Sequence, residues 1–128
     1  MKKFMKVSVM AMVAMFAMAT AADAQKKWAV QCDYVEGLAC VKDANGKWGH
    51  INEQGKLIGK MWRSVCYFQD GLAPVSEDDK TFGYIDKTEK VVIPFKFKKA
   101  YPFEHGKARV QDEDGNWRKI DKTGKFID

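Results

Sequence analysis

The sequence predicts an all-β protein, in which three tandem repeats of about 34 residues stack into one repeat domain. Three observations support this fold class. One residue pattern recurs at an offset of 34 and then 35 positions, and apolar residues alternate with polar ones within each copy. No segment after residue 24 shows the 3.6-residue spacing of a helix. We therefore expect short antiparallel strands joined as hairpins.

The repeat is defined by small, aromatic and β-branched residues that keep one register in every copy. The copies span approximately 34–58, 68–93 and 103–127, and we assign the one extra residue before the third copy to Pro102. The signature residues are Gly37, Ala39, Val41, Trp48, Gly49 and Ile51 in the first copy, Gly71, Ala73, Val75, Phe82, Gly83 and Ile85 in the second, and Gly106, Ala108, Val110, Trp117 and Ile120 in the third. Each copy is predicted to hold three short strands.

The first connection in each copy is predicted to be a hairpin loop. Asn45-Gly46 and Asp114-Gly115 are strong hairpin signals because both residue types tolerate positive φ. A loop of odd length would place Ala39 and Val41 on the same face as Gly49 and Ile51, whereas a two-residue loop would not. We therefore expect the odd loop.

The second connection resembles a type I turn followed by a left-handed residue. It begins with Asn or Asp and ends with Gly in the copies at 52–55 and 121–124. In the copy at 86–89 the last residue is Glu89, where a side chain should cost about 1 kcal/mol. The sequence therefore predicts that Glu89→Gly raises the melting temperature.

Both faces of the predicted hairpin carry apolar residues. Trp48 and Ile51 are an odd number of positions apart, so a regular strand points them to opposite faces. Either the hairpin is covered on both sides, or a bulge at Gly49 turns the strand. In both cases a single repeat cannot bury its apolar surface and must stack on a neighbour.

The first 24 residues are expected to be a signal peptide. Lys2, Lys3 and Lys6 precede an uncharged run from 7 to 19, and Ala22-Asp23-Ala24 matches the small-x-small pattern that precedes a cleavage site, here after Ala24. That run has 13 residues, whereas a membrane span needs roughly 20. We expect an exported protein, periplasmic or secreted, with no membrane span after processing and with residues 25–128 as its single repeat domain.

The charge of the chain argues against nucleic acid as a partner. The whole chain has 22 basic and 17 acidic side chains, a net charge of +5. Without three lysines and one aspartate of the signal peptide, 19 basic and 16 acidic side chains remain, a net charge of +3. Their signs are well mixed along the sequence, which favours solubility over a basic binding stripe.

The three cysteines follow the predicted signal peptide, so one disulfide and one free thiol are expected in an oxidising compartment. Cys32 and Cys66 are repeat equivalents, with Ala100 as the third member, and form a candidate disulfide if the repeats stack closely. The alternative is a buried position for small residues. Cys40 shares its register with Pro74 and Arg109, and we expect it to be exposed.

The repeat resembles the family of WG repeats, which is named for a Trp-Gly pair such as Trp48-Gly49. The second copy follows the family pattern most fully, with "FQDGLAPV" at 68–75, "FGYID" at 82–86 and "VVIP" at 91–94. The chain departs from the pattern at Phe82, Glu89 and Arg118. The resemblance implies a β-rich repeat array in bacterial, often exported, proteins, and it implies no catalytic residues.

The sequence offers no catalytic, metal-binding or cofactor-binding motif. His50 aligns with Tyr84 and Lys119, and His105 aligns with acidic residues, so we expect both histidines to face solvent. The acidic segment 112–116 lacks the glycine and glutamate that an EF-hand needs, and we interpret it as a polar hairpin tip. We therefore expect a protein that is not an enzyme.

A candidate ligand surface lies in the segment "PFKFKKAYPF" at 94–103, where aromatic residues alternate with lysines. Lys96, Lys98, Lys99 and Tyr101 would bind an anionic partner there. The alternative is a strand with core phenylalanines and solvated lysines. The sequence thus favours an exported, non-catalytic binding scaffold for a protein or an envelope glycan, with a structural repeat unit and a small envelope enzyme as alternatives. It sets no oligomeric state.

Overall fold

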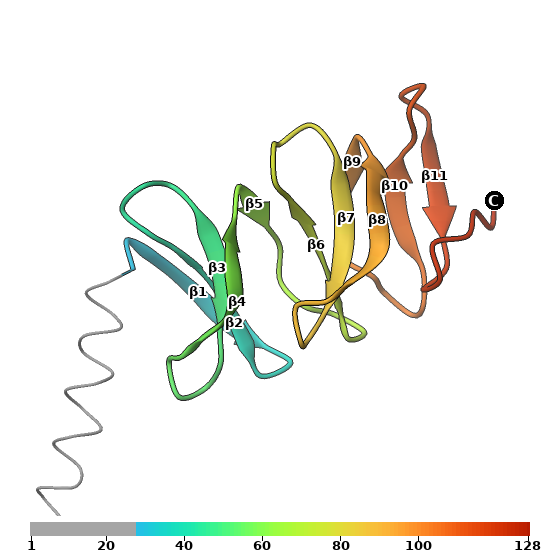
Figure 1. The fold of residues 1–128 in the computed structure, drawn as a ribbon. Coiled ribbons are helices and arrows are strands. Elements are labelled where there is room, and N and C mark those ends of the chain that lie inside the picture. Colours follow the sequence, from blue (N-terminus) through green and yellow to red (C-terminus); the bar gives the residue numbers. More distant parts are fainter. Residues whose placement is uncertain (1–27) are drawn as a thin grey trace, which may run out of the picture.

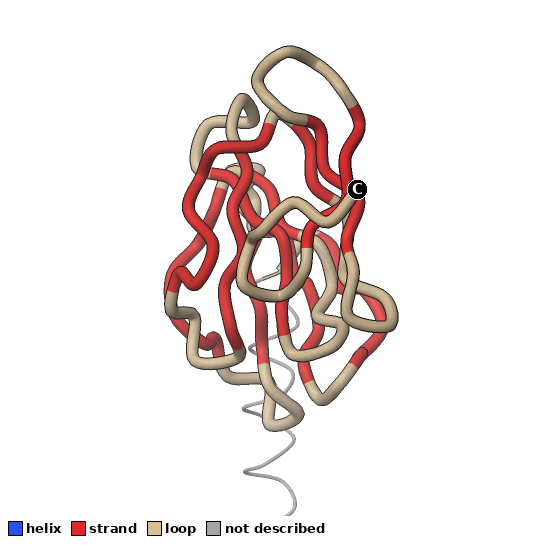
Figure 2. The backbone as a smooth tube through the Cα atoms, turned by 90° about the vertical axis from the view of Figure 1, so that its right-hand side faces the viewer, coloured by secondary structure: helices blue, strands red, loops and turns tan. Residues whose placement is uncertain are grey.

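The computed structural model describes residues 28–128, and the expected signal peptide with its cleavage site after Ala24 lies outside them. The described residues form strands and loops with no helix, which confirms the predicted all-β class (Figure 2). The strands are β1 (Val30–Val35), β2 (Leu38–Lys42), β3 (Trp48–Ile51), β4 (Leu57–Trp62), β5 (Ser64–Val65), β6 (Leu72–Ser76), β7 (Phe82–Asp86), β8 (Val91–Phe97), β9 (Lys99–Ala100), β10 (Ala108–Gln111) and β11 (Trp117–Ile120).

The strands form three antiparallel sheets that follow one another in a row (Figure 1). Sheet 1 has the order β1-β2-β3-β4, sheet 2 has the order β5-β6-β7-β8, and sheet 3 has the order β11-β10-β9. The predicted copies began too late, because each sheet starts with an additional edge strand, β1, β5 or β9. The sequence pattern missed them because β5 and β9 have two residues each and β1 is largely exposed.

The hairpin register is the one that an odd loop predicts. Ala39 pairs with Ile51 and Val41 pairs with Gly49, and Ala73 and Ile85 pair in the same way in sheet 2. Paired residues of neighbouring strands share a face. The small and β-branched signature residues therefore lie together on one side of each sheet.

A single five-residue turn is used at both kinds of connection. Asp43 Oδ1 accepts hydrogen bonds from the backbone N–H groups of Asn45 and Lys47, at 2.8 and 2.9 Å. In the turns that begin at Asn52, Asp86, Asp112 and Asp121, the side-chain oxygen of the first residue accepts the two equivalent hydrogen bonds. The fourth residue is left-handed in each of them, and Glu89 has φ +70°, so the predicted turn geometry is confirmed.

Both faces of sheet 2 are covered. On one side Ala73, Val75 and Ile85 pack against Leu38 and Trp62 of sheet 1. On the other side a second core joins sheet 2 to sheet 3 and contains Leu72, Tyr84, Ile93, Phe97, Phe103, Ala108, Val110 and Ile120. The register also shifts between Trp48 and His50, and again between Phe82 and Tyr84. The structure therefore has both features that could explain the apolar pattern: a sheet covered on two sides and a bulge in the strand.

The glycine of the Trp-Gly pair lies where the next strand passes closely. A Cβ at Gly83 would lie 2.6 Å from the backbone oxygen of Ile93, closer than real atoms approach. Arg118 takes this position in sheet 3, where β11 pairs with β10 on one side. On the other side no strand follows, and the chain contacts β11 through an isolated Ile120–Phe126 bridge, a hydrogen bond from the Ile127 N–H to the Lys119 carbonyl oxygen, and the carboxylate of Asp128. Without a strand crossing at residue 118, a side chain is tolerated there.

The extra residue of the longer repeat lies in β8, and its assignment to Pro102 is wrong. Ile51 pairs with Leu57 and His50 with Ile58, whereas Ile85 pairs with Val91 and Tyr84 with Ile93. One additional residue, Val92, is therefore accommodated by an irregularity in the strand. As a consequence the third equivalent of Cys32 and Cys66 is Tyr101, and not Ala100.

Candidate functional site

The two internal junctions between sheets show what a sheet face does when another sheet follows it. His50 is fully buried between sheets 1 and 2, so the expectation that it faces solvent is wrong. Its Nε2 lies 2.9 Å from the carbonyl oxygen of Cys66, and its Nδ1 lies 3.2 Å from Glu89 Oε2. The ring also packs edge-on against Phe68.

Tyr84 makes the equivalent contacts between sheets 2 and 3. Its hydroxyl donates a hydrogen bond of 2.7 Å to the carbonyl oxygen of Tyr101, and its ring packs edge-on against Phe103. Burial raises the pKa of Tyr84. His and Tyr differ in sequence, but both reach a carbonyl oxygen of the next sheet. Variation at this position therefore reflects two solutions to one contact, and not solvent exposure.

A second contact between the sheets involves the two-residue turns that connect the first strand of each sheet to its second strand. The carboxylate of Glu36 accepts hydrogen bonds from the backbone N–H groups of Asp70 and Gly71, at 2.8 and 3.0 Å. The carboxylate of Asp70 in turn accepts one from Gly106, at 2.8 Å. Desolvation, the largest single effect, raises the pKa of Glu36, but these N–H groups and Lys87 together lower it.

The outer face of sheet 3 carries cations at the positions that make these contacts in sheets 1 and 2. Lys119 is the equivalent of His50 and Tyr84, and Lys107 is the equivalent of Leu38 and Leu72. Arg109 replaces Cys40 and Pro74, and His105 replaces Glu36 and Asp70. The residues Lys107, Arg109, Lys119 and His105 are all exposed, and no further sheet follows within residues 28–128.

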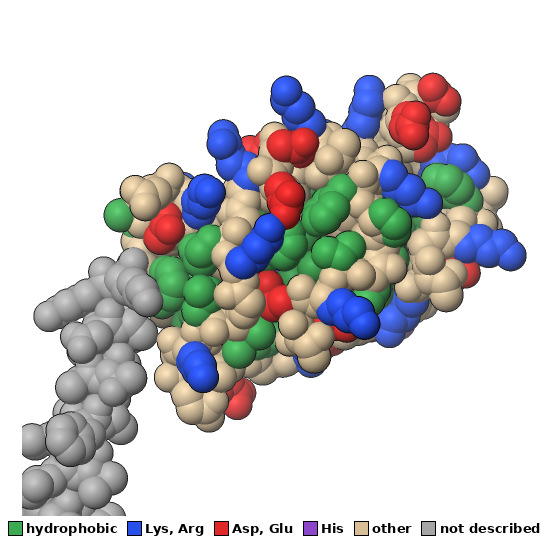
Figure 3. Space-filling view, viewed as in Figure 1, with side chains coloured by type: hydrophobic (Ala, Val, Ile, Leu, Met, Phe, Trp, Pro, Cys, Tyr) green, Lys and Arg blue, Asp and Glu red, His purple; other side chains and the backbone are tan. Residues whose placement is uncertain are grey.

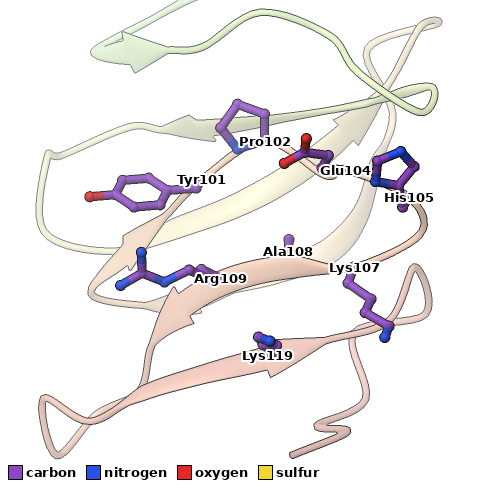
Figure 4. Close-up of a pocket in the computed structure, with 8 residues that line it drawn as sticks. All are labelled: Tyr101, Pro102, Glu104, His105, Lys107, Ala108, Arg109 and Lys119. Atoms are coloured by element: carbon purple, nitrogen blue, oxygen red, sulfur yellow. The ribbon is translucent and has the colours of Figure 1, made fainter.

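These side chains surround a hollow of about 520 Å³, which we call the end-face pocket (Figure 4). It is lined by Tyr101, Pro102, Glu104, His105, Lys107, Ala108, Arg109 and Lys119. The guanidinium of Arg109 lies 5.5 Å from the ring centre of Tyr101 and 4.9 Å from that of Trp117. Three cationic side chains thus face one carboxylate, Glu104.

The pocket has the chemistry of an anion-binding site with a flat apolar wall. Arginine can bind a carboxylate or a phosphate with two parallel hydrogen bonds. The rings of Tyr101 and Trp117 are stacked with centres 5.5 Å apart, and the two side chains are 46% and 42% exposed. On the face of the molecule that Figure 3 shows, Lys and Arg side chains are interspersed with Asp and Glu side chains.

The candidate ligand surface predicted from the sequence is divided by the structure. Tyr101 lines the end-face pocket, whereas Lys96 lines a separate hollow beside Phe97 and Arg118. Lys98 and Lys99 are exposed and line neither hollow. Phe97 is buried and the three lysines are exposed, as the alternative interpretation of an alternating strand required.

Sequence reasoning missed Lys107, Arg109 and Lys119 as a group. The signal was present in the repeat alignment, because all three replace uncharged or weakly basic residues of the first two copies. These substitutions indicate a shared surface only once the structure shows that the equivalent positions in sheets 1 and 2 face the next sheet. His105 is exposed as expected, and it joins the same pocket.

The cysteines lie differently from the prediction. Cys40 is only 6% exposed, because its position faces sheet 2, and the expectation of an exposed thiol is wrong. Burial, followed by the nearby thiols of Cys32 and Cys66, raises the pKa of Cys40 to about 12. Cys32 is exposed and Cys66 is half-buried, and all three are free thiols.

Within residues 28–128, no group of three or more His, Cys, Asp or Glu side chains is placed to hold a metal ion. The segment 112–116 forms the five-residue turn closed by Asp112, as a polar hairpin tip.

The described part of the chain also contains no helix that is long and apolar enough to cross a membrane.

Comparison with protein families gives one match. Residues 82–117 match the family model described as WG containing repeat, which confirms over these residues the resemblance found in the sequence. They extend from the Phe82-Gly83 pair of one copy to Trp117 of the next, which is one full period. No curated protein matches the chain.

Comparison with solved structures gives partial likenesses. The crystal structure of HIRA(644-1017) superposes with a TM-score of 0.49 at 9% identity, over 78% of this chain and 38% of that one. A crystal structure of the computationally designed Ika8 protein superposes with a TM-score of 0.47 at 15% identity, over 74% of this chain and 34% of that one. The chain therefore spans little more than a third of either structure.

Proposed function

From the WG containing repeat that the chain carries at residues 82–117, we propose that it is a non-catalytic binding module of the bacterial envelope. Its ligand is an anionic partner, a protein or a glycan rich in carboxylates, and the binding site is the end-face pocket. Repeat arrays commonly present extended faces to partners.

The observation that carries the proposal is the exchange of residues on the last sheet. Internal sheets use these positions to contact the next sheet through Leu38, Leu72, His50 and Tyr84. Sheet 3 places Lys107, Arg109 and Lys119 there, around a hollow with an aromatic wall. A polar outer face alone would keep sheet 3 soluble; a hollow that gathers three cations and one carboxylate beside Tyr101 goes beyond that need.

A comparison of two charge-reversed variants tests the proposal. Lys107, Arg109 and Lys119 are replaced together by Glu in one variant, and Lys96, Lys98 and Lys99 in the other, so that both change the net charge equally. Binding of the full chain to immobilised polygalacturonate, to polyglutamate and to neutral dextran is measured at several salt concentrations. We expect the end-face variant to lose binding to a carboxylated polymer by at least about tenfold, because three charge contacts of roughly 0.5–1 kcal/mol each are reversed.

The outcomes of this experiment separate the alternatives. Retention on polygalacturonate alone indicates a glycan ligand, and retention on polyglutamate alone indicates an acidic protein. An equal loss in both variants would show attraction by net charge only, and the end-face pocket would no longer be the site. Wild-type binding equal to that on dextran would favour the structural repeat unit that needs no ligand.

Export is part of the proposal, because an envelope partner requires it. The full chain is expressed in a bacterial host and the N-terminal residue of the accumulated protein is determined. We expect Gln25, as the predicted cleavage after Ala24 requires. A cytoplasmic product that still begins with the Met1 segment would contradict export.

A further inference from the structure

All three cysteines of the chain line one hollow, which the proposed binding function does not use. The hollow has a volume of about 270 Å³ and lies where sheet 1 meets the start of sheet 2. Apart from Cys32, Cys40 and Cys66, its lining is mostly apolar and includes Val35, Trp48 and Val65. A chain with three cysteines among 128 residues has therefore brought all of them to one place.

The strand register sets the relation between Cys32 and Cys40. Gln31 pairs with Val41 and Tyr34 pairs with Ala39 across β1 and β2, and the register shifts between these two pairs, so a bulge sets Cys32 and Asp33 together opposite Cys40. Residues that lie opposite each other in an antiparallel pair have Cα atoms about 4.5–5.5 Å apart. That separation suits a disulfide, which needs Cα atoms about 4.4–6.8 Å apart.

Cys66 stands in a different relation to Cys32. The two are repeat equivalents in neighbouring sheets, and face-to-face sheets lie about 10 Å apart. The backbone of Cys66 is held in place on both sides, because its N–H donates to the Pro74 carbonyl oxygen and its own carbonyl oxygen contacts His50 Nε2. It cannot approach Cys32 without breaking these contacts.

We propose that Cys32 and Cys40 are an oxidation site that forms a cross-strand disulfide, with Cys66 left as a free thiol. The candidate pair inferred from sequence, Cys32 with Cys66, is thereby replaced by a pair within sheet 1. A soft metal ion is a weaker explanation of the three thiols, since the described residues hold no group of three such side chains placed to coordinate one.

The oxidant is a disulfide, such as oxidised glutathione or the disulfide of an oxidoreductase. The exposed Cys32 loses its proton, and its thiolate attacks one sulfur of the oxidant, so that one thiolate leaves and a mixed disulfide forms. The sulfur of Cys40 then attacks the Cys32 sulfur and displaces the second thiol. Two cysteines are oxidised, one disulfide is reduced to two thiols, and the two protons pass to those thiols.

The different environments of the two thiols fit this order of events. Burial keeps Cys40 protonated, so it is a poor first nucleophile and is inaccessible to a bulky oxidant. Cys32 lies on an edge strand that is exposed along most of its length. The resulting bond would tie this edge strand to β2 and stop it from opening.

Peptide mapping of the folded full chain tests the proposal. The protein is incubated with oxidised glutathione, free thiols are alkylated, and the chain is digested with trypsin without reduction. Cys32 and Cys40 then share the peptide 28–42, and Cys66 lies in the peptide 64–80. We expect peptide 28–42 to be two hydrogens lighter and unalkylated, and peptide 64–80 to be alkylated once.

A second cut shows which sulfurs are joined. Cleavage after Glu36 separates the two cysteines of peptide 28–42, and we expect the halves 28–36 and 37–42 to stay together until a reductant is added. The variant Cys66→Ala should give the same result, whereas Cys40→Ala should leave Cys32 as a mixed disulfide with glutathione. A bond between 28–36 and 64–80, or two alkylated cysteines in 28–42 after oxidation, would overturn the proposal.

Discussion

At the scale of single residues, the most informative positions are those where the chain departs from its own repeat. Glu89 occupies a left-handed position that holds glycine in the equivalent turns. Its side chain is 5% exposed, and its Oε1 accepts a hydrogen bond of 3.1 Å from Trp62 Nε1. The Cys66 carbonyl oxygen can only accept a hydrogen bond, so His50 Nε2 must carry the hydrogen of that contact. The contact between His50 Nδ1 and Glu89 Oε2 is then attractive only if a second proton lies between these two atoms.

We now expect Glu89→Gly to destabilise the fold, which reverses the prediction from the sequence. Relief of the left-handed strain gains about 1–2 kcal/mol, but Trp62 and His50 each lose a buried partner at a cost of about 1–3 kcal/mol. Two such losses minus the gain leave a net loss of about 0–5 kcal/mol, with a midpoint of about 2–3 kcal/mol, to be measured by chemical denaturation. Glu89→Gln keeps the side chain and can donate to His50 Nδ1, so it should retain most of the stability. A stabilised Glu89→Gly would show that backbone strain dominates.

The two glycines of the aromatic-Gly pairs should differ in their tolerance of a methyl group. At Gly83 the added Cβ would meet the backbone oxygen of Ile93, whereas at Gly49 it would meet Met61 Sδ, also at 2.6 Å. A methionine side chain can move and a paired strand cannot. We expect Gly83→Ala to cost about 1–3 kcal/mol and Gly49→Ala to cost less. Equal unfolding midpoints for the two variants would contradict this explanation of the glycine.

At the scale of elements, one arrangement of side-chain hydrogen bonds stabilises most of the turns between strands. A carboxyl or amide oxygen at the first residue of a turn accepts two backbone N–H groups, and Asp86 also accepts the hydroxyl of Thr88 at 2.6 Å. The Thr88 hydroxyl and then the backbone N–H of Lys90 lower the pKa of Asp86, and the equivalent groups of Thr123 and Lys125 lower the pKa of Asp121. These two turns are therefore more stable when Asp86 and Asp121 are ionised.

This preference predicts a loss of stability in acid. A carboxylate whose pKa is lowered by folding stabilises the native state above its unfolded pKa of about 3.9, and the contribution disappears as the pH falls through the folded pKa. Asp86→Asn keeps the accepting oxygen without the charge, so its free energy of unfolding should fall less steeply between about pH 5 and pH 2. The matched control is Asp33→Asn, outside these turns. Parallel curves for Asp86→Asn and wild type would contradict the role of the charge.

At the scale of the whole molecule, stability depends on junctions between sheets. Sheet 2 is apolar on both faces and is covered by sheet 1 and sheet 3, so it cannot be stable alone. Each junction adds a buried hydrogen bond from His50 or Tyr84 and a link between turns through Glu36 or Asp70. Within residues 28–128, the outer face of sheet 3 carries cations at the positions that make these contacts in sheets 1 and 2.

The junction between sheets 2 and 3 can be tested with a matched pair of tyrosines. Tyr84→Phe removes a buried hydrogen bond to the Tyr101 carbonyl, and Tyr34→Phe removes an exposed one to the Asn52 carbonyl. We expect a loss of about 1–2 kcal/mol for Tyr84→Phe and under about 0.5 kcal/mol for Tyr34→Phe. The measurement is urea unfolding followed by amide exchange in β10. If sheet 3 exchanges no faster in Tyr84→Phe, the hydrogen bond does not couple the sheets.

The sequence by itself determined the fold class, the hairpin register and the turn chemistry, because all three depend on neighbours within one repeat. Ala39 and Ile51 could be placed on one face because the recurring apolar positions favour a loop of odd length, and the five-residue turn could be identified from its first and fourth residues. Only the tertiary structure decided what lies between the sheets: the burial of His50 and Cys40, the use of Glu89 and the place of the extra residue in β8. The same holds for the end-face pocket, since Lys107, Arg109 and Lys119 form a group only when their positions are known to face outward from the last sheet. A repeat pattern shows which residues are equivalent, but it does not show what each one contacts in the next sheet.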